Sequence, residues 1–197
     1  MFYPRPSREH LHMLTAVAWG NRALCSSPKR KVGCVITNGH MDRIISFGYN
    51  GPAKNLPPDY CARWKEDHPE LQGGGVSRCP CIHSEVNAIT RAQESLQDCR
   101  MFVTLPPCEP CAHIIINSGI KAVYFVGEYS NRDGVNLLLN AGLFVRSPDA
   151  DWPSLYGGDF HVTPRLNITG IPPELQESFM QHLESQADAF LKAKSLR

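Results

Sequence analysis

The sequence lacks several features that would define its class at once. No stretch approaches 18 consecutive apolar residues, which argues against a transmembrane helix. Residues 1–10 lack the charged and then apolar layout of a secretion signal, so we expect a cytoplasmic chain. Neither sign of charge dominates, because 20 Lys and Arg face 19 Asp and Glu, a net charge of +1. That balance argues against a protein held on nucleic acid by bulk charge.

What the sequence does contain is an ordinary globular composition with an unusual share of potential metal ligands. Its 197 residues, 42% hydrophobic and 20% charged, are enough for one domain with a hydrophobic core. Eight Cys and eight His are present. Without a secretion signal, disulfides are a poor default. The thiols are therefore either small buried apolar groups or metal ligands, and their spacing has to decide.

Hydrophobic periodicity predicts an alternation of helices and strands. The predicted order is helix 7–24, strands 32–37 and 43–50, helix 83–96, strand 101–106, helix 108–119, strand 121–127, helix 132–142 and strand 143–146. Asn38-Gly39 joins the first two strands into a hairpin. This order predicts an α/β fold, a three-layer α/β/α sandwich around a mixed five-stranded sheet.

Two segments do not fit the alternation. Residues 51–82 show little regularity and are long for a loop inside a compact domain, so something must order them. Residues 147–197 begin polar and end in an amphipathic stretch, 172–197, which predicts a terminal helix that docks on the domain or on a neighbouring subunit. We therefore divide the chain into a domain, 1–146, and a C-terminal extension, 147–197.

Two short motifs carry the candidate chemistry. HSE, residues 83–85, starts a predicted helix, and PCEPC, residues 107–111, directly follows a buried strand. Cys108 and Cys111 are three positions apart, so in a helix both thiols face one way, and a helix N-terminus favours the thiolate. With His83 they form a candidate set of three zinc ligands, which leaves the fourth position of a tetrahedral ion open for water.

Glu85 adds a proton carrier to this set. It follows His83 by two residues and can lie beside the water, where a carboxylate can both accept and donate a proton. Alone, a histidine such as His83 is more often a capping or core residue, and a lone C-x-x-C is more often half of a structural zinc site or a redox pair. Together, the residues match the H-x-E…P-C-x-x-C signature of zinc-dependent deaminases.

With these motifs the chain resembles the cytidine and deoxycytidylate deaminase superfamily, and within it the deoxycytidylate (dCMP) deaminases. The segments that carry the resemblance, within residues 7–146, are VGCVI (32–36), GYNG (48–51), HSEVNAI (83–89), TLPPCEPCA (104–112) and SGIKAVYF (118–125). The resemblance implies zinc-dependent hydrolysis of dCMP to dUMP and ammonia, supplying dTMP synthesis, with Glu85 as the catalytic residue. It also implies a homo-oligomer, since many such enzymes are hexamers regulated by dCTP and dTTP.

The resemblance extends to residues that would contact the nucleotide. Asn50 should hydrogen-bond the sugar, the backbone N–H of Ser84 should meet the base, and Tyr129 should close over the nucleotide. Ser84 stands where alanine is commoner in the family. The candidates for the phosphate are Lys29, Arg30, Lys31 and Arg132. Plainer alternatives stay open: Asn50 as a turn residue, Tyr129 as a surface aromatic, and the basic run as a solvated charged face.

A second metal site is implied by the resemblance to some phage and bacterial members. There, a closed structural zinc would be held by Cys25, Cys61, Cys79 and Cys81, with His68 in reserve. Such an ion would staple the insertion 51–82 to the domain. The alternative is a set of scattered free thiols. The two remaining cysteines, Cys34 and Cys99, are interpreted as ordinary small apolar residues.

Rival functions stay open. The enzyme could act on dCTP, on a 5-modified dCMP or on a free nucleoside. A nucleic-acid deaminase is disfavoured because the sequence shows no basic and aromatic stripe of the kind that single-strand binders combine. A non-catalytic binding module with a relic site is the last alternative. We therefore expect a small-molecule nucleotide as partner, and neither nucleic acid nor a membrane.

Overall fold

A computed structural model describes residues 7–25, 31–71, 80–126 and 131–146. All of them lie in the first of the two units into which the chain divides, Met1–Asp149. The helix predicted within 172–197 lies outside the described residues and stays a prediction. None of the described helices is long and apolar enough to cross a membrane.

The centre of the fold is one five-stranded mixed sheet in the order β2-β1-β3-β4-β5. The strands are β1 (Gly33–Thr37), β2 (Ile44–Tyr49), β3 (Arg100–Val103), β4 (Ala122–Phe125) and β5 (Phe144–Arg146). β1 pairs antiparallel with both β2 and β3, whereas β3, β4 and β5 run parallel. The predicted hairpin and the mixed sheet of five strands are thus confirmed.

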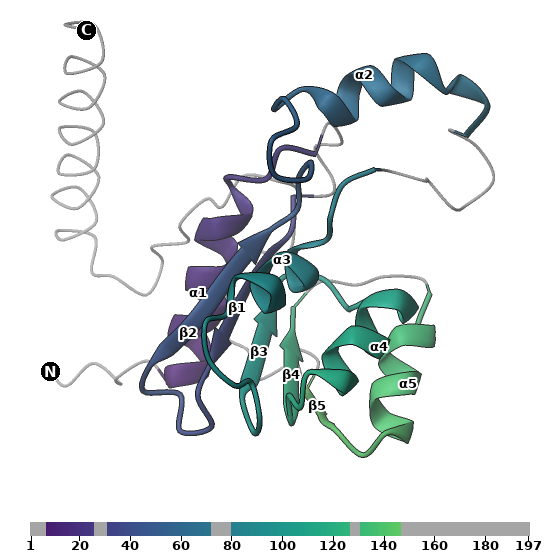
Figure 1. The fold of residues 1–197 in the computed structure, drawn as a ribbon. Coiled ribbons are helices and arrows are strands. Elements are labelled where there is room, and N and C mark those ends of the chain that lie inside the picture. Colours follow the sequence, from purple (N-terminus) through teal and green to yellow (C-terminus); the bar gives the residue numbers. More distant parts are fainter. Residues whose placement is uncertain (1–6, 26–30, 72–79, 127–130, 147–197) are drawn as a thin grey trace, which may run out of the picture. The chain divides into compact units, whose positions relative to one another are not determined.

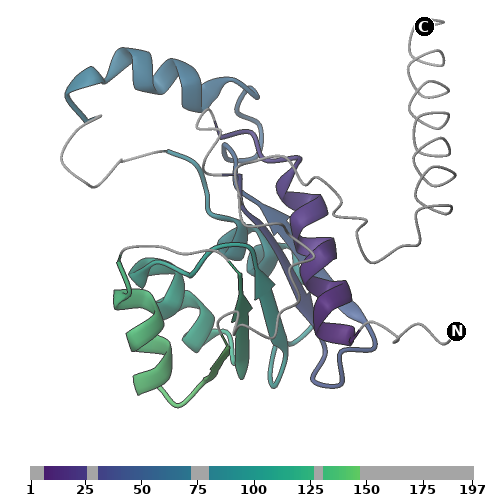
Figure 2. The same cartoon turned by 180° about the vertical axis from the view of Figure 1, so that it is seen from behind.

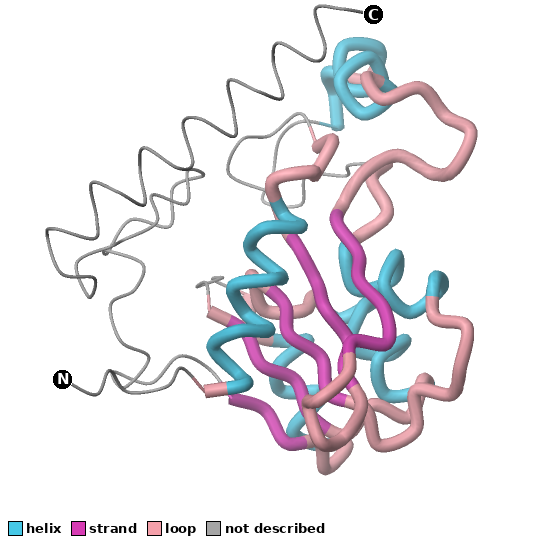
Figure 3. Tube along the Cα trace, turned by 90° about the vertical axis from the view of Figure 1, so that its left-hand side faces the viewer, coloured by secondary structure: helices cyan, strands magenta, loops and turns pink. Residues whose placement is uncertain are grey.

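Helices cover both faces of this sheet. The described helical elements are α1 (Arg8–Gly20), α2 (Tyr60–Asp67), the 3-10 turn η2 (Pro69–Leu71), α3 (Ser84–Arg91), α4 (Glu109–Asn117) and α5 (Asp133–Asn140), of which α2 and η2 lie in the insertion and do not cover the sheet. α1 packs on one face, and α3, α4 and α5 lie on the other, as Figures 1 and 2 show from opposite sides. Figure 3 shows the sheet between the two helical layers. The predicted three-layer α/β/α architecture is confirmed.

Alternation along the strands supplies both hydrophobic layers. Met101 and Val123 belong to the buried cluster that α3, α4 and α5 cover. Their neighbours Phe102 and Tyr124 point to the other face, where their rings stack with centroids 4.7 Å apart. The His12 ring of α1 lies 5.3 Å from the ring of Phe102. Since successive strand residues face opposite ways, β3 and β4 contribute to both layers.

Two helices end earlier than the hydrophobic periodicity predicts. α1 begins where predicted, with the Ser7 hydroxyl accepting a hydrogen bond from the His10 N–H at 3.2 Å, but ends at Gly20 instead of residue 24. α3 ends at Arg91 instead of residue 96 because Ala92 is extended. The insertion 51–82, in which the sequence shows little regularity, contains α2. α2 buries only Cys61, and therefore shows no apolar stripe that periodicity could detect.

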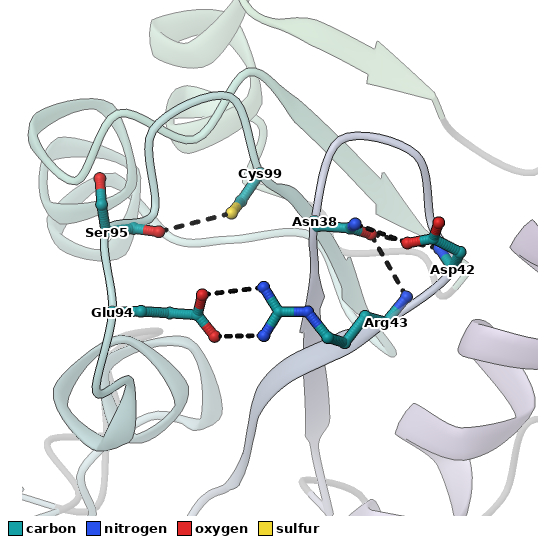
Figure 4. Close-up of polar contacts among 6 residues, drawn as sticks. All are labelled: Asn38, Asp42, Arg43, Glu94, Ser95 and Cys99. Carbon is teal, nitrogen blue, oxygen red and sulfur yellow. Dashed lines mark hydrogen bonds and ion pairs between the residues drawn. The ribbon is translucent and has the colours of Figure 1, made fainter.

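An ion pair ties the β1–β2 hairpin to the connection between α3 and β3. The Arg43 guanidinium donates two hydrogen bonds to the Glu94 carboxylate, at 2.6 and 2.8 Å (Figure 4). Both side chains are about half exposed, at 57% and 43%. Because water and salt screen an exposed pair, this contact adds little to stability and mainly orients the hairpin.

Candidate active site

Two helix N-termini bring the ligands of the two sequence motifs together. His83 is the N-cap residue of α3 and Cys108 is the N-cap residue of α4, and neither side chain caps its own helix. Instead, His83 Nδ1 lies 3.4 Å from Cys108 Sγ and 3.3 Å from Cys111 Sγ. Across the described residues, this is the single group of three or more His, Cys, Asp or Glu ligand atoms within 4.8 Å of one another.

The geometry of this group fits a zinc ion. Tetrahedral zinc with ordinary Zn–S and Zn–N bonds places a sulfur and a nitrogen ligand atom about 3.6 Å apart. The two sulfur–nitrogen distances, 3.4 and 3.3 Å, are close to that value. Cys111 is buried, while Cys108 is half-buried and His83 is exposed, so the group opens toward solvent on one side. Three ligands with an open side are typical of a catalytic zinc site and differ from a closed structural one.

The charges of the group are set by its own contacts. Hydrogen bonding with Cys111, and then with His83, lowers the pKa of Cys108 to about 4. The same contact raises the pKa of Cys111 far above its usual range, because two adjacent thiolates would repel. Hydrogen bonding with Cys108 raises the pKa of His83. The side chains alone therefore hold one thiolate, and a bound cation would favour the second.

Glu85 lies in the first turn of α3 and is buried, with 4% of its surface exposed. Burial raises the pKa of its carboxyl group, while the positive charge of His83 opposes that rise. The Ser84 hydroxyl, itself fully buried, donates a hydrogen bond to Glu85 Oε2 at 2.9 Å. The role predicted for Ser84 was that of its backbone N–H, and the side-chain contact was not predicted, although a serine next to the glutamate in the sequence could have suggested it.

The other predicted substrate contacts are placed only in part. Asn50 is buried, and its Oδ1 accepts a hydrogen bond from the Val32 N–H at 2.8 Å, so this amide holds the start of β1. Lys31 is exposed, and Arg132 is exposed at the start of α5. The remaining candidates lie outside the described residues; they are Tyr129, Lys29 and Arg30. None of these roles is tested by the geometry.

The proposed ligands of a second zinc do not form a metal site in the described part of the chain. Cys25, Cys61 and Cys81 do form a buried cluster of their own, but their sulfur atoms do not all lie within 4.8 Å of one another. Cys79 lies outside the described residues, and the Nδ1 atom of the reserve ligand His68 is 3.3 Å from a Glu70 carboxylate oxygen. The described residues therefore show one metal-ligand group, and a second, structural zinc is not shown.

The last two cysteines lie where the sequence analysis expects them. Cys34 and Cys99 both belong to the main hydrophobic cluster of the domain, at 0% and 3% exposed. Burial, and then the nearby charge of Glu85, raises the pKa of Cys34, so this thiol stays protonated. Both residues act as small apolar groups.

Comparison with known proteins agrees with the zinc-binding geometry of the site. Residues 6–127 match the family described as the cytidine and deoxycytidylate deaminase zinc-binding region. A Caenorhabditis elegans protein named probable deoxycytidylate deaminase is 38% identical over 107 residues, 54% of this chain and 50% of that protein. Human deoxycytidylate deaminase is 32% identical over 138 residues, 66% of this chain and 75% of the human one. The match thus spans half the length of the nematode relative.

A solved structure is similar over most of the described domain. The crystal structure of dCMP deaminase from the cyanophage S-TIM5, in complex with dCMP and dUMP, superposes with a TM-score of 0.59 at 26% sequence identity. The similarity covers 74% of this chain and 100% of the phage chain. The family match spans more than half of the chain and includes both helix N-termini that carry the ligand group. This protein belongs to the cytidine and deoxycytidylate deaminase family.

Proposed function

We propose that this chain is a dCMP deaminase, which hydrolyses dCMP to dUMP and ammonia and so supplies dTMP synthesis. The observation that carries the proposal is the group of His83, Cys108 and Cys111 beside the buried carboxyl of Glu85. The choice of dCMP is supported by the relatives named deoxycytidylate deaminase and by the phage enzyme described in complex with dCMP and dUMP.

In this proposal His83, Cys108 and Cys111 hold one zinc ion, and Glu85 moves the protons. Zinc at this position would polarise a water molecule and lower its pKa. Glu85 accepts a proton from that water and delivers it to ring N3, while the water oxygen forms a bond to C4. Glu85 then carries the second proton of the water to the amino group on C4. The C4–N bond breaks, ammonia leaves, and C4 keeps the oxygen as the carbonyl of dUMP.

The environment of Glu85 suits a group that both accepts and donates protons. Burial raises its pKa, and a proton carrier works best when its pKa lies near the working pH. The hydrogen bond from the Ser84 hydroxyl leaves the carboxylate fewer orientations. The backbone N–H of Ser84 and the Asn50 side chain are proposed to bind the base and the sugar, with Tyr129 closing over them. The proposed phosphate contacts are Lys29, Arg30, Lys31 and Arg132.

The proposal is tested by a substrate panel with the purified full-length chain. Release of ammonia is followed with dCMP, dCTP, deoxycytidine, 5-hydroxymethyl-dCMP and a single-stranded oligonucleotide. We expect the highest kcat/KM for dCMP and no turnover of the oligonucleotide. A preference for dCTP or the modified nucleotide would show that the substrate is another cytosine nucleotide. Equal activity with deoxycytidine would show that the proposed phosphate contacts do not contribute to binding.

The proposal includes a second, structural zinc on Cys25, Cys61, Cys79 and Cys81. It is supported by the buried cluster that three of these cysteines form, which joins the turn after α1, helix α2 and the segment before α3. Metal analysis should give two zinc ions per chain, and one in Cys61→Ser. Cys99→Ser removes a buried thiol outside both sites and should keep two. One zinc in the unmodified chain would overturn this part.

The wider organisation is also part of the proposal. Residues 1–146 form the deaminase domain, 147–197 form an extension with a terminal helix, and the chain acts in the cytoplasm as a homo-oligomer, a hexamer by its resemblance to other dCMP deaminases. Light scattering of the full-length chain tests the assembly. A mass equal to one chain would contradict it.

A further inference from the structure

The side chain of Asn87 connects the end of β2, next to Asn50, with the segment that leads into His83. Asn87 lies in α3, and its backbone N–H donates to the carbonyl of His83 at 3.0 Å, one turn earlier. Its side-chain Nδ2 donates to the Tyr49 carbonyl at 2.9 Å, at the end of β2. The same Nδ2 lies 3.5 Å from the Ile82 carbonyl oxygen, in the residue just before His83. One amide therefore contacts the segments on either side of the site.

The segment that Asn87 contacts is the one that carries Asn50. Tyr49 precedes Asn50 and accepts the hydrogen bond from Asn87. Gly51 follows Asn50 and exchanges two backbone hydrogen bonds with Ile82, at 3.2 and 2.8 Å. The residue before Asn50 is thus bonded to α3, and the residue after it is bonded to the segment that leads into His83.

Close packing of β2 on α3 makes this connection stiff. A Cβ atom at Gly48 would lie 2.1 Å from the Ser84 carbonyl oxygen and 2.5 Å from the Ala88 nitrogen, so only glycine allows this approach. The Ser46 hydroxyl donates to the Ala88 carbonyl at 2.7 Å. These two contacts fix the distance between strand and helix, but neither reaches Asn50 or His83. Besides the backbone pair between Gly51 and Ile82, the Asn87 side chain is the described side-chain contact that joins segment 49–51 to α3 and to the residue before His83.

We propose that Asn87 is a positioning residue, which holds the nucleoside-binding segment 49–51 in register with His83 and Glu85. The inference rests on the proposed function, because Asn50 is taken to bind the sugar. If Asn50 and the residues of α3 move relative to each other, the sugar stays bound while C4 of the base is displaced from Glu85. Displacements of about 1 Å can cost roughly 100-fold in rate, so the effect should fall mainly on kcat.

The test compares Asn87→Ala with Asn140→Ala in the full-length, zinc-loaded chain. Asn140 is exposed at the end of α5 and provides a matched removal of a helical asparagine. With dCMP, we expect Asn87→Ala to lower kcat roughly 10- to 100-fold while KM changes less than about threefold. Zinc content and Tm should stay close to those of the unmodified chain, and Asn140→Ala should retain its kinetics. Asn87→Ser replaces Asn87→Ala if the latter is poorly folded.

A double-mutant cycle separates positioning from a purely structural role. Asn50→Asp keeps the acceptor for the Val32 N–H but replaces the amide donor. If Asn87 acts by aligning Asn50, its removal should matter much less in the Asn50→Asp background, with a coupling above about 1 kcal/mol, which is roughly a fivefold change in kcat/KM.

Three results would overturn the inference: unchanged kinetics of Asn87→Ala, additive effects in the cycle, or a loss that only follows loss of zinc. Failure of the proposed function looks different, because the unmodified chain would then not turn over dCMP.

Discussion

The molecule gathers cysteine side chains in two places, and the backbone presents them differently. Cys108 and Cys111 lie at the N-terminus of one helix and face His83 at the N-terminus of another, with their ligand atoms within 4.8 Å. Cys25 and Cys61 pack with Cys81 in a buried cluster whose members come from three separate segments. The first group is open on one side, while all three members of the second are buried.

The surroundings of the thiols differ between the two groups, and these surroundings decide whether a group can take part in a reaction. At the first group, one helical turn fixes the spacing of the two sulfur atoms, and the helix N-terminus favours negative charge. The carboxyl group of Glu85 also accepts a hydrogen bond from the Ser84 hydroxyl. In the second group no two cysteines share one helical turn, although Cys61 lies in the first turn of α2, and all three thiols are buried. Disrupting the first should therefore change chemistry, and disrupting the second should change stability.

The largest effect is expected from Cys111→Ser, which removes a ligand from the first group. We expect loss of zinc from this site and a fall in kcat/KM of at least about 10⁴-fold, because bound zinc lowers the pKa of water by about 8 units. Metal analysis and dCMP kinetics on the same sample provide the measurement. Activity retained without zinc would show that the group of His83, Cys108 and Cys111 is not a zinc-dependent reaction centre.

Glu85→Gln should separate metal binding from proton transfer. The amide keeps the size of the side chain but cannot carry a proton, so kcat should fall roughly 10²- to 10⁴-fold. Zinc content should match that of the unmodified chain, since Glu85 is not part of the ligand group. A variant with nearly full activity would remove Glu85 from its proposed role.

Cys61→Ser tests the buried cluster. The variant places a more polar hydroxyl in a fully buried position and would lose the proposed structural zinc, so the free energy of unfolding should fall by at least about 1–3 kcal/mol in urea titrations. The kcat of the folded variant should stay within about twofold of that of the unmodified chain, because Cys61 does not belong to the ligand group. A catalytic defect without loss of stability would show that the two regions are coupled.

A smaller effect is expected from Ser84→Ala, inside the first group. The variant loses the hydrogen bond to Glu85 Oε2 but keeps the backbone N–H. One such bond is worth about 1 kcal/mol, so kcat should fall roughly fivefold with little change in KM. Stopped assays over a range of dCMP concentrations distinguish the two. Unchanged kcat would mean that burial alone orients the carboxylate.

The smallest effect is expected far from both groups, at Arg43→Gln. The variant breaks the exposed pair with Glu94 that Figure 4 shows. Screening by water makes such pairs weak, so Tm should change by no more than about 1–2 °C and kcat should not change. A larger loss of activity would show that the hairpin influences the site through β2.

The sequence predicted the sheet well and the insertion poorly, for one reason. Strands 32–37 and 121–127 are short apolar runs whose burial follows from composition, and the structure has strands at both places. α2 buries one residue, Cys61, and so has no periodic pattern to detect. The ligand residues were predicted from their order and spacing, whereas the Asn87 contacts to Tyr49 and Ile82 depend on how β2 packs on α3.

By itself, the sequence determined the chemical identity of the candidate site. H-x-E and P-C-x-x-C supply one imidazole, two thiols and a carboxyl, and the local spacing places each pair at the start of a helix. Only the tertiary structure decided that His83 Nδ1 and the two sulfur atoms lie 3.3–3.4 Å apart, since 25 residues separate the first two of them in the chain. It also decided that Asn50 supports β1, and that three other cysteines from separate segments pack together in a buried cluster. Spacing along one helical turn is a local property, whereas the meeting of two helices depends on the packing of the whole sheet.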